Sequence, residues 1–225
     1  MPFTARTAEE TAAARVRFHA DGYAPIPGLL TSDCLHELRA ETQRLVAIAR
    51  RRDFTMSCMD DSPRHMTTLG GHVIARESSR MREFYENPVL LGLVAAVVDE
   101  LPVTVPDLLE RHVFNVLHRQ GDTHGAHTDD CPYAMVIFLE APHSLADGGL
   151  LQYVPRVGAL ADLDTDRARS AHHRAGDAYL LRSDVTAHRV TSLTRPGVRR
   201  MVLNFAYTTR SAAPRSTQSA RELYM

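Results

Sequence analysis

Apolar positions in the first part of the chain recur at the three- and four-residue spacing of amphipathic helices. Residues 8–20, rich in Ala, Glu and Arg, predict a first helix, which the glycine- and proline-containing segment 22–28 ends. Thr31 or Ser32 can cap a second helix, which runs toward the basic residues 50–52. We expect these basic residues to be a solvated helix end at the negative end of the helix dipole.

The pattern changes twice before residue 105. Segment 53–71 has no regular period and contains Met, Ser, Pro and paired Gly, which predicts an irregular loop of the kind that often carries function. Residues 79–99 return to helical spacing, with a break at Asn87-Pro88 because the residue before a proline is displaced from the helical region.

After Pro106 the pattern becomes that of β-strands. Short apolar runs separated by Gly, Pro and Asp turns lie at residues 112–118, 134–139, 150–154, 178–181, 188–191 and 200–207. Strands that follow a helical part predict an α+β fold, with a β-sandwich or jelly-roll core at about 106–210 braced by helices at about 1–105. We expect residues 1–225 to form one domain.

Charge and composition narrow the class of protein. The formal net charge is −1, so the chain lacks the basic footprint of a nucleic-acid-binding protein, and a small polar ligand fits better. No apolar run is long enough to span a bilayer, and the first residues do not resemble a signal peptide, so we expect a cytoplasmic protein. The three cysteines form no CxxC motif, which favours free thiols. The oligomeric state, a homodimer included, stays open.

The motif His127-Thr128-Asp129 is the strongest local signal for chemistry. An imidazole and a carboxylate two residues apart in a strand point to the same side, where both can bind one metal ion. An isolated pair of this kind is more often a polar turn, but His188 opens a later strand and can supply a second imidazole. Two histidines and one carboxylate leave coordination positions open, the arrangement that suits oxygen-activating iron(II). The alternative for His188 is a structural histidine.

Arginine begins the last predicted strand. Alternation places Arg200, Val202 and Asn204 on one face and Arg199 on the other. We expect Arg200 to face the cavity, where a buried guanidinium requires an anionic partner such as a dicarboxylate. The alternative is that both arginines are exposed at a strand end.

Together, the His-x-Asp pair, the distant His188 and Arg200 resemble the iron(II)/2-oxoglutarate-dependent oxygenases, whose fold is a double-stranded β-helix, or jelly roll. The chain is most similar to the subgroup of halogenases and lysine hydroxylases that act on free amino acids without a carrier protein. The segments that carry this resemblance are residues 53–56, 62–64, 70–75, 121–127, 146–149 and 180–184.

The resemblance implies Fe(2+), 2-oxoglutarate as co-substrate and O2, with Arg200 binding 2-oxoglutarate. The family's chemistry implies decarboxylation to succinate, removal of a hydrogen atom from an aliphatic carbon and hydroxyl rebound. Halogenases of the subgroup replace the metal carboxylate by a small residue, so Asp129 implies hydroxylation.

The resemblance also implies a substrate pocket for an amino acid. The matching positions are Arg64, Glu110, His124, Asp130 and Asn204, and Tyr224 stands where the subgroup has a tryptophan near the chain end. Lysine is the leading substrate, with ornithine, arginine or a related polar amino acid as alternatives.

Two further interpretations stay open. A metal cupin that is an isomerase or a small-molecule sensor would share the barrel and the histidines, and a binding module without metal would make the histidines incidental. We interpret residues 159–174 as a polar surface insertion and do not assign His172 and His173 as ligands. His118 is expected to be structural.

Overall fold

One curled antiparallel sheet organises the protein. The computed structural model describes residues 2–212 and 218–225, and within them twelve strands join in the order β1-β10-β7-β12-β5-β3-β6-β11-β8-β9, with β2 beside β3 and β4 beside β12. The strands are β1 (Tyr23–Ile26), β2 (Arg50–Met56), β3 (Ser62–Leu69), β4 (Val103–Thr104), β5 (His112–Leu117), β6 (Thr123–His127), β7 (Tyr133–Glu140), β8 (Leu151–Tyr153), β9 (Arg169–Ala171), β10 (Ala178–Leu181), β11 (His188–Val190) and β12 (Arg200–Thr208).

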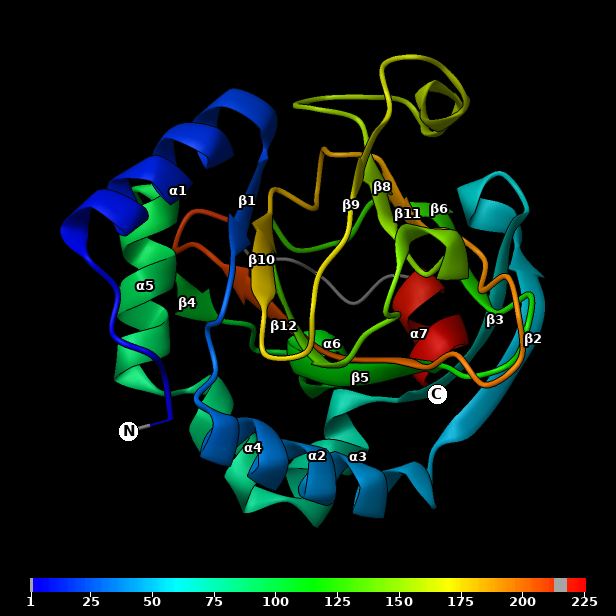
Figure 1. Ribbon diagram of the computed structural model, residues 1–225, viewed down its shortest axis with the longest axis horizontal. Helices are drawn as coiled ribbons and strands as arrows, with labels where there is room; N and C mark the ends of the chain where they lie inside the picture. The colour runs from blue at the N-terminus through cyan, green and yellow to red at the C-terminus, as the bar shows by residue number, and fades with distance from the viewer. Residues whose placement is uncertain (1, 213–217) are drawn as a thin grey trace.

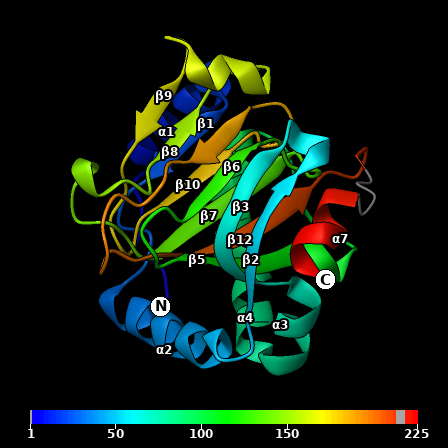
Figure 2. The ribbon, with the colours of Figure 1, turned by 90° about the vertical axis from the view of Figure 1, so that its right-hand side faces the viewer.

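Seven helices in the described residues pack against this sheet. They are α1 (Ala8–Asp21), α2 (Ser32–Val46), α3 (Gly71–Glu77), α4 (Ser79–Tyr85), α5 (Pro88–Val98), α6 (Leu108–Arg111) and α7 (Gln218–Tyr224), with short 3-10 turns η1 (Ser57–Met59), η2 (Leu145–Asp147) and η3 (Leu160–Asp164). Figure 1 shows α1 and α5 side by side near β1, and Figures 1 and 2 show α2, α3 and α4 grouped along one side of the sheet. The predicted α+β class is confirmed.

The predicted helix boundaries follow from local chemistry. Thr7 and Glu10 form a capping box at the start of α1, and Gly22 ends that helix with a φ of 74°, a conformation that suits glycine. Thr31 caps α2, and Asn87 caps α5 with Pro88 in the first turn. The expected helices and the break at Asn87-Pro88 are therefore confirmed.

The prediction for residues 50–71 was wrong. Arg50, Arg51 and Arg52 do not end a helix but begin β2, and β2 pairs in register with β3 along its whole length. β2 has little polar-apolar alternation because it lies at an edge, where charged side chains reach solvent. The β3 strand is specified by distant partners, β5 and β6, which local sequence does not reveal.

Strand alternation in β12 is confirmed. Met201, Leu203 and Phe205 belong to the main apolar core, whereas Arg200 and Asn204 line a cavity inside the curled sheet. Arg199 lies on the outer side in an ion pair with Glu140. One face of β12 thus packs in the apolar core, and the other face lines the cavity.

The stretch 159–174 is only partly the surface insertion we predicted. It contains η3 and β9, and several of its residues are exposed, but His173 is 5% exposed and packs among aromatic side chains. The local pattern of residues 159–174 does not reveal this burial, because the residues that cover His173 come from β1, β7 and β10.

The described residues contain three cysteines and no long apolar helix. Cys34, Cys58 and Cys131 are all free thiols, as predicted. In the part of the chain that the structure describes, every helix is too short or too polar to cross a membrane.

Candidate active site

Two neighbouring strands carry the candidate metal ligands. His127 at the end of β6 pairs directly with His188 at the start of β11. His127 Nε2 lies 3.7 Å from Asp129 Oδ1, and His188 Nε2 lies 3.9 Å from Asp129 Oδ2. One ligand atom of each residue falls within 4.8 Å of the others, a spacing that one metal ion can bridge. The three predicted ligands therefore converge.

Backbone carbonyls orient both imidazoles. His127 Nδ1 lies 2.7 Å from the carbonyl oxygen of Gly125, and His188 Nδ1 lies 2.9 Å from that of Thr186. With Nδ1 donating, Nε2 carries a free lone pair directed at the common point, the usual arrangement for a histidine that binds metal. Burial, followed by the imidazoles of His124 and His188, holds the pKa of His127 well below its usual range, so the ring stays neutral.

Asp129 reaches the same point from beyond the end of β6. The prediction that regular strand alternation aligns it with His127 was wrong, since β6 ends at His127. The backbone N–H of Asp129 instead donates to the carbonyl of Ser183 at 2.8 Å, which fixes the turn. Burial raises the pKa of this carboxyl, so its charged form needs a cation beside it.

A β-bulge adds a further histidine to this face. Between β6 and β11, the span from His188 to Val190 faces the longer span from His127 to His124, so β6 contains an extra residue. The rings of His124 and His127 consequently stack, with centroids 4.1 Å apart. His124 Nε2 is buried without a hydrogen-bond partner.

Two cavities meet at these residues, and both are lined by His124, His127 and Asp129. The first also contains Arg200, Asn204, Asn115 and Tyr179. The second also contains Arg64, Glu110, Asp130 and Tyr224. The structure therefore brings together all the predicted site residues, but it places Asn204 in the cavity of Arg200 and away from the predicted substrate pocket.

Arg200 is a buried cation without an acidic partner. It is 3% exposed, makes no ion pair with any described carboxylate, and has an unpartnered Nε. Its guanidinium carbon lies 4.9 Å from the centre of the Phe138 ring, and Tyr179 is its hydrogen-bonding neighbour. Burial lowers the pKa of Arg200. Such a group is costly unless an anion occupies the cavity.

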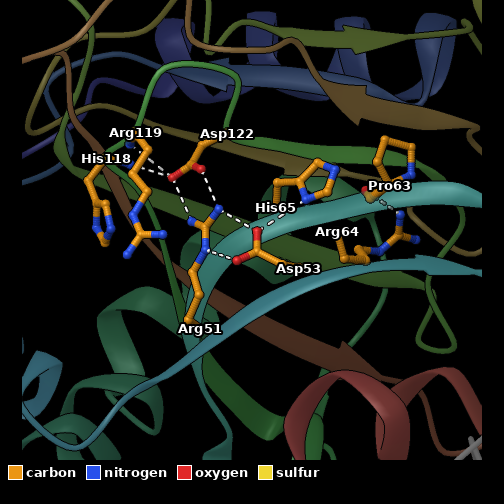
Figure 3. A network of polar contacts seen from close by, with 8 residues as sticks. All are labelled: Arg51, Asp53, Pro63, Arg64, His65, His118, Arg119 and Asp122. Atoms are coloured by element: carbon orange, nitrogen blue, oxygen red, sulfur yellow. Dashed lines mark hydrogen bonds and ion pairs between the residues drawn. The ribbon is translucent and has the colours of Figure 1, made fainter.

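Arg64 is the corresponding cation of the second cavity. Its side chain is 1% exposed and donates to Ser62 Oγ at 2.8 Å and to the carbonyl of Pro63 at 3.0 Å, while Nε has no partner. Burial lowers the pKa of Arg64 to about 10. Figure 3 shows Arg64 projecting from β3, where it pairs with His124 of β6.

Acidic groups line the same cavity as Arg64. Burial, followed by repulsion from Asp130 and Asp129, raises the pKa of Glu110 to about 9. Two neighbouring carboxyls cannot both ionise cheaply in a buried site unless a cation joins them. The cavity thus offers one buried cation and one carboxyl pair.

A buried ion pair supports the strand that carries the histidines. Asp122, which is 1% exposed, accepts hydrogen bonds from the backbone N–H groups of His118 and Arg119 in the turn before β6. Arg51 of β2 lies between Asp122 and Asp53, as Figure 3 shows. This network fixes the β5–β6 turn against the β2–β3 pair. His118 contributes its backbone here and lies outside both cavities.

Sequence reasoning missed Asn115 and Tyr179. Asn115 accepts a hydrogen bond from Thr68 Oγ1 at 2.7 Å, so it links β5 to β3, and it lines the cavity that contains Arg200. The single amide in the apolar run of β5 could have indicated that Asn115 belongs to a site. No comparable pattern marks Tyr179, because tyrosine is common in ordinary strands.

The residues present fit an iron ion with a dicarboxylate. Two neutral imidazoles and one carboxylate converge, and the adjoining cavity ends at an unpaired guanidinium. A family model described as halogenase D matches residues 6–224. The chain belongs to the halogenase D family. A search of curated protein sequences found no match.

Several solved structures share the fold of this chain. The epimerase SnoN in complex with Fe3+, alpha ketoglutarate and nogalamycin RO is 16% identical, with a TM-score of 0.74 over 94% of this chain and 88% of that one. AviO1 from Streptomyces viridochromogenes Tue57 is 20% identical, with a TM-score of 0.70 over 95% and 100%.

HygX from Streptomyces hygroscopicus, with nickel and 2-oxoglutarate bound, is 16% identical, with a TM-score of 0.64 over 96% of this chain and 94% of that one. At these identities the likeness is one of fold, and it confirms the predicted jelly-roll core.

Proposed function

We propose that the protein is an iron(II)- and 2-oxoglutarate-dependent hydroxylase of a free polar amino acid, with lysine as the leading substrate. One observation carries the proposal. The His127, Asp129 and His188 ligand atoms converge where a cavity that contains Arg200 meets a second cavity that contains a buried arginine and two neighbouring carboxyls. Family membership and the ligands bound in the solved neighbours support it.

Each cavity then has a separate task. Arg200 binds the distal carboxylate of 2-oxoglutarate through a bidentate fork, which orients the keto acid toward the metal ligands. The bound iron, with 2-oxoglutarate and O2, supplies the oxidising chemistry that inserts oxygen into an aliphatic C–H bond. The surrounding protein places that bond, because an error of about 1 Å costs roughly a hundredfold in rate.

The second cavity suits a cationic amino acid. Arg64 pairs with the α-carboxylate, and the Glu110–Asp130 pair holds ammonium groups by charge-assisted hydrogen bonds. A cation there stabilises the charged form of Glu110, which offsets the burial and the repulsion from Asp130 that raise the pKa of Glu110. Ornithine and arginine satisfy the same pattern, and Tyr224 also lines this cavity.

Asp129 favours hydroxylation within a family named for halogenation. Its carboxylate approaches both histidine Nε2 atoms and supplies a negative ligand where the resemblance gives halogenases a small residue. Chloride would have to displace or join a negative group already in place. We therefore expect products that gain oxygen and none that gain chlorine.

Anaerobic titration with iron(II) and 2-oxoglutarate tests the metal and co-substrate assignments. We expect the weak visible band of the iron chelate to appear and to respond to added lysine. A metal cupin that is an isomerase or a sensor would bind metal and show no such band with 2-oxoglutarate. A metal-free binding module would show neither response.

A screen of free amino acids, read by mass spectrometry in the presence of chloride and by succinate release, tests the substrate class. We expect an oxygen-containing product with a cationic amino acid. Glu110→Gln should raise KM for that substrate, whereas Glu83→Gln, an exposed change on α4, should not. Succinate at background with every amino acid would reject the substrate class and leave the metal site intact.

A further inference from the structure

His173 lies next to the cavity that contains Arg200, although it belongs to neither cavity lining. It follows β9 in the chain and is 5% exposed, in contrast to its neighbour His172, which is half-buried and contacts the carbonyl of Pro142. The function proposed above gives His173 no role. A buried histidine beside a buried arginine nevertheless requires a physical reason.

The imidazole of His173 stacks on the ring of Phe138. Their centroids are 4.6 Å apart and their planes differ by 18°. Phe138 is the same ring against which Arg200 packs, with its guanidinium carbon 4.9 Å from the ring centre. One phenyl ring thus contacts both the histidine and the cation.

Tyr23 fixes the other edge of His173. The Tyr23 hydroxyl lies 3.0 Å from His173 Nε2, and Nδ1 has no partner. Burial, followed by the charge of Arg200, lowers the pKa of His173 to about 3, so the ring is neutral. A neutral flat ring can pack beside a guanidinium, which an imidazolium could not do without repulsion.

Arg200 depends on such apolar support for its direction. No described carboxylate holds the guanidinium, and its Nε has no hydrogen-bond partner. Among the described residues, Tyr179 and the face of Phe138 lie beside it. If the Phe138 ring turned, the fork that faces the cavity would lose its preferred orientation.

We propose that His173 is a positioning residue for the co-substrate, which holds the Phe138 ring in the orientation that directs Arg200 into the cavity. The inference rests on the proposed function, in which Arg200 binds the distal carboxylate of 2-oxoglutarate. It assigns the ring of His173, rather than its charge, to this task.

A pair of substitutions at His173 separates the effect of a flat ring from the effect of side-chain volume. His173→Leu fills similar space without a flat ring, and His173→Phe restores the ring, while both remove the hydrogen bond to Tyr23. His172→Leu is the matched control one residue away. The readout is the Kd of 2-oxoglutarate for nickel-loaded protein by calorimetry, which needs no turnover, together with KM for the amino acid and the melting temperature.

We expect His173→Leu to raise the Kd of 2-oxoglutarate about five- to tenfold, as the loss of an ordered cation–π contact implies. His173→Phe should stay within about twofold of the native protein, and His172→Leu should not change it. KM for the amino acid should stay constant in all three. Should His173→Leu not fold, Phe138→Leu replaces it, with the same expected rise.

A folded leucine variant that binds 2-oxoglutarate as tightly as the native protein would overturn the inference, as would a phenylalanine variant as weak as the leucine one. Failure of the native protein to bind 2-oxoglutarate at all would instead reject the proposed function. The two failures are therefore distinguishable.

Discussion

His124 and His127 present their rings to the same cavity, stacked with centroids 4.1 Å apart, although they are three residues apart in one strand. A regular strand would send them to opposite faces. The bulge between β6 and β11 adds the residue that brings them together. Gly125 lies in this bulge, and a Cβ there would meet the carbonyl oxygen of Pro63 at 2.6 Å.

We therefore expect Gly125→Ala to disturb the β6 strand that carries the metal ligand His127. The added methyl group forces β3 and β6 apart, and we expect a loss of about 1–3 kcal/mol of unfolding free energy with weaker iron(II) binding. Denaturant unfolding and metal titration measure the two effects. Gly92→Ala on α5, where an added Cβ meets nothing within 4 Å, should stabilise the protein by about 0.5–1 kcal/mol. Equal effects of the two changes would contradict the role of the bulge.

Arg200→Met should have opposite effects on binding and on stability. We expect loss of 2-oxoglutarate binding by roughly a hundredfold or more, because a charge-assisted fork is removed. Without ligand, the variant should be as stable as the native protein or more stable, since an unpaired buried cation is replaced by an apolar chain. Melting curves with and without 2-oxoglutarate test both. Arg199→Met, on the outer face, should leave ligand binding unchanged, and a strongly destabilised Arg200→Met would count against an unpaired cation.

His112 should make the protein sensitive to acid. It is 1% exposed, both ring nitrogens lack partners, and burial lowers its pKa to about 4. The unfolded chain binds the proton first as pH falls below about 6.5. The stability that neutral His112 contributes is thus complete above that pH and is lost as pH falls toward 4, by roughly 2–4 kcal/mol.

His112→Phe tests this acid sensitivity. A phenyl ring can keep the stacking contact with Tyr85 and breaks no hydrogen bond. We expect equal or greater stability at pH 7 and a flatter profile between pH 6.5 and 4 in denaturant unfolding. The exposed His36→Gln on α2 serves as control and should keep the native profile. If the slope of His112→Phe matched the native one, another group would be responsible.

Arg51 pairs with one buried and one exposed carboxylate, so the contributions of the two to stability can be compared. Its guanidinium contacts Asp122, which is 1% exposed, and Asp53, which is 48% exposed. Asp122→Ala should cost about 3–5 kcal/mol, because it leaves two backbone N–H groups without their acceptor and removes the buried partner of Arg51. Asp53→Ala should cost at most about 1 kcal/mol. Equilibrium unfolding measures both losses of stability. Similar losses for the two variants would show that burial of the carboxylate does not determine its contribution to stability.

Much of the site was visible in the sequence because its signals are local. The alternation that turns Arg200 inward and the caps at Thr31 and Asn87 depend on residues near one another in the chain. Local spacing decides which face of a strand a side chain occupies and where a helix begins. The family resemblance extended this to Arg64, Glu110 and Asp130, which do share a cavity.

Only the tertiary structure decided the rest, since the causes are distant in sequence. Residues 50–56 and 62–69 become strands because β2, β5 and β6 pair with β3, and His173 is buried because β1, β7 and β10 enclose it. The bulge at Gly125 exists in the register between β6 and β11, so no period within β6 could show it. Pairing and burial are properties of two segments together, and a single segment read alone does not contain them.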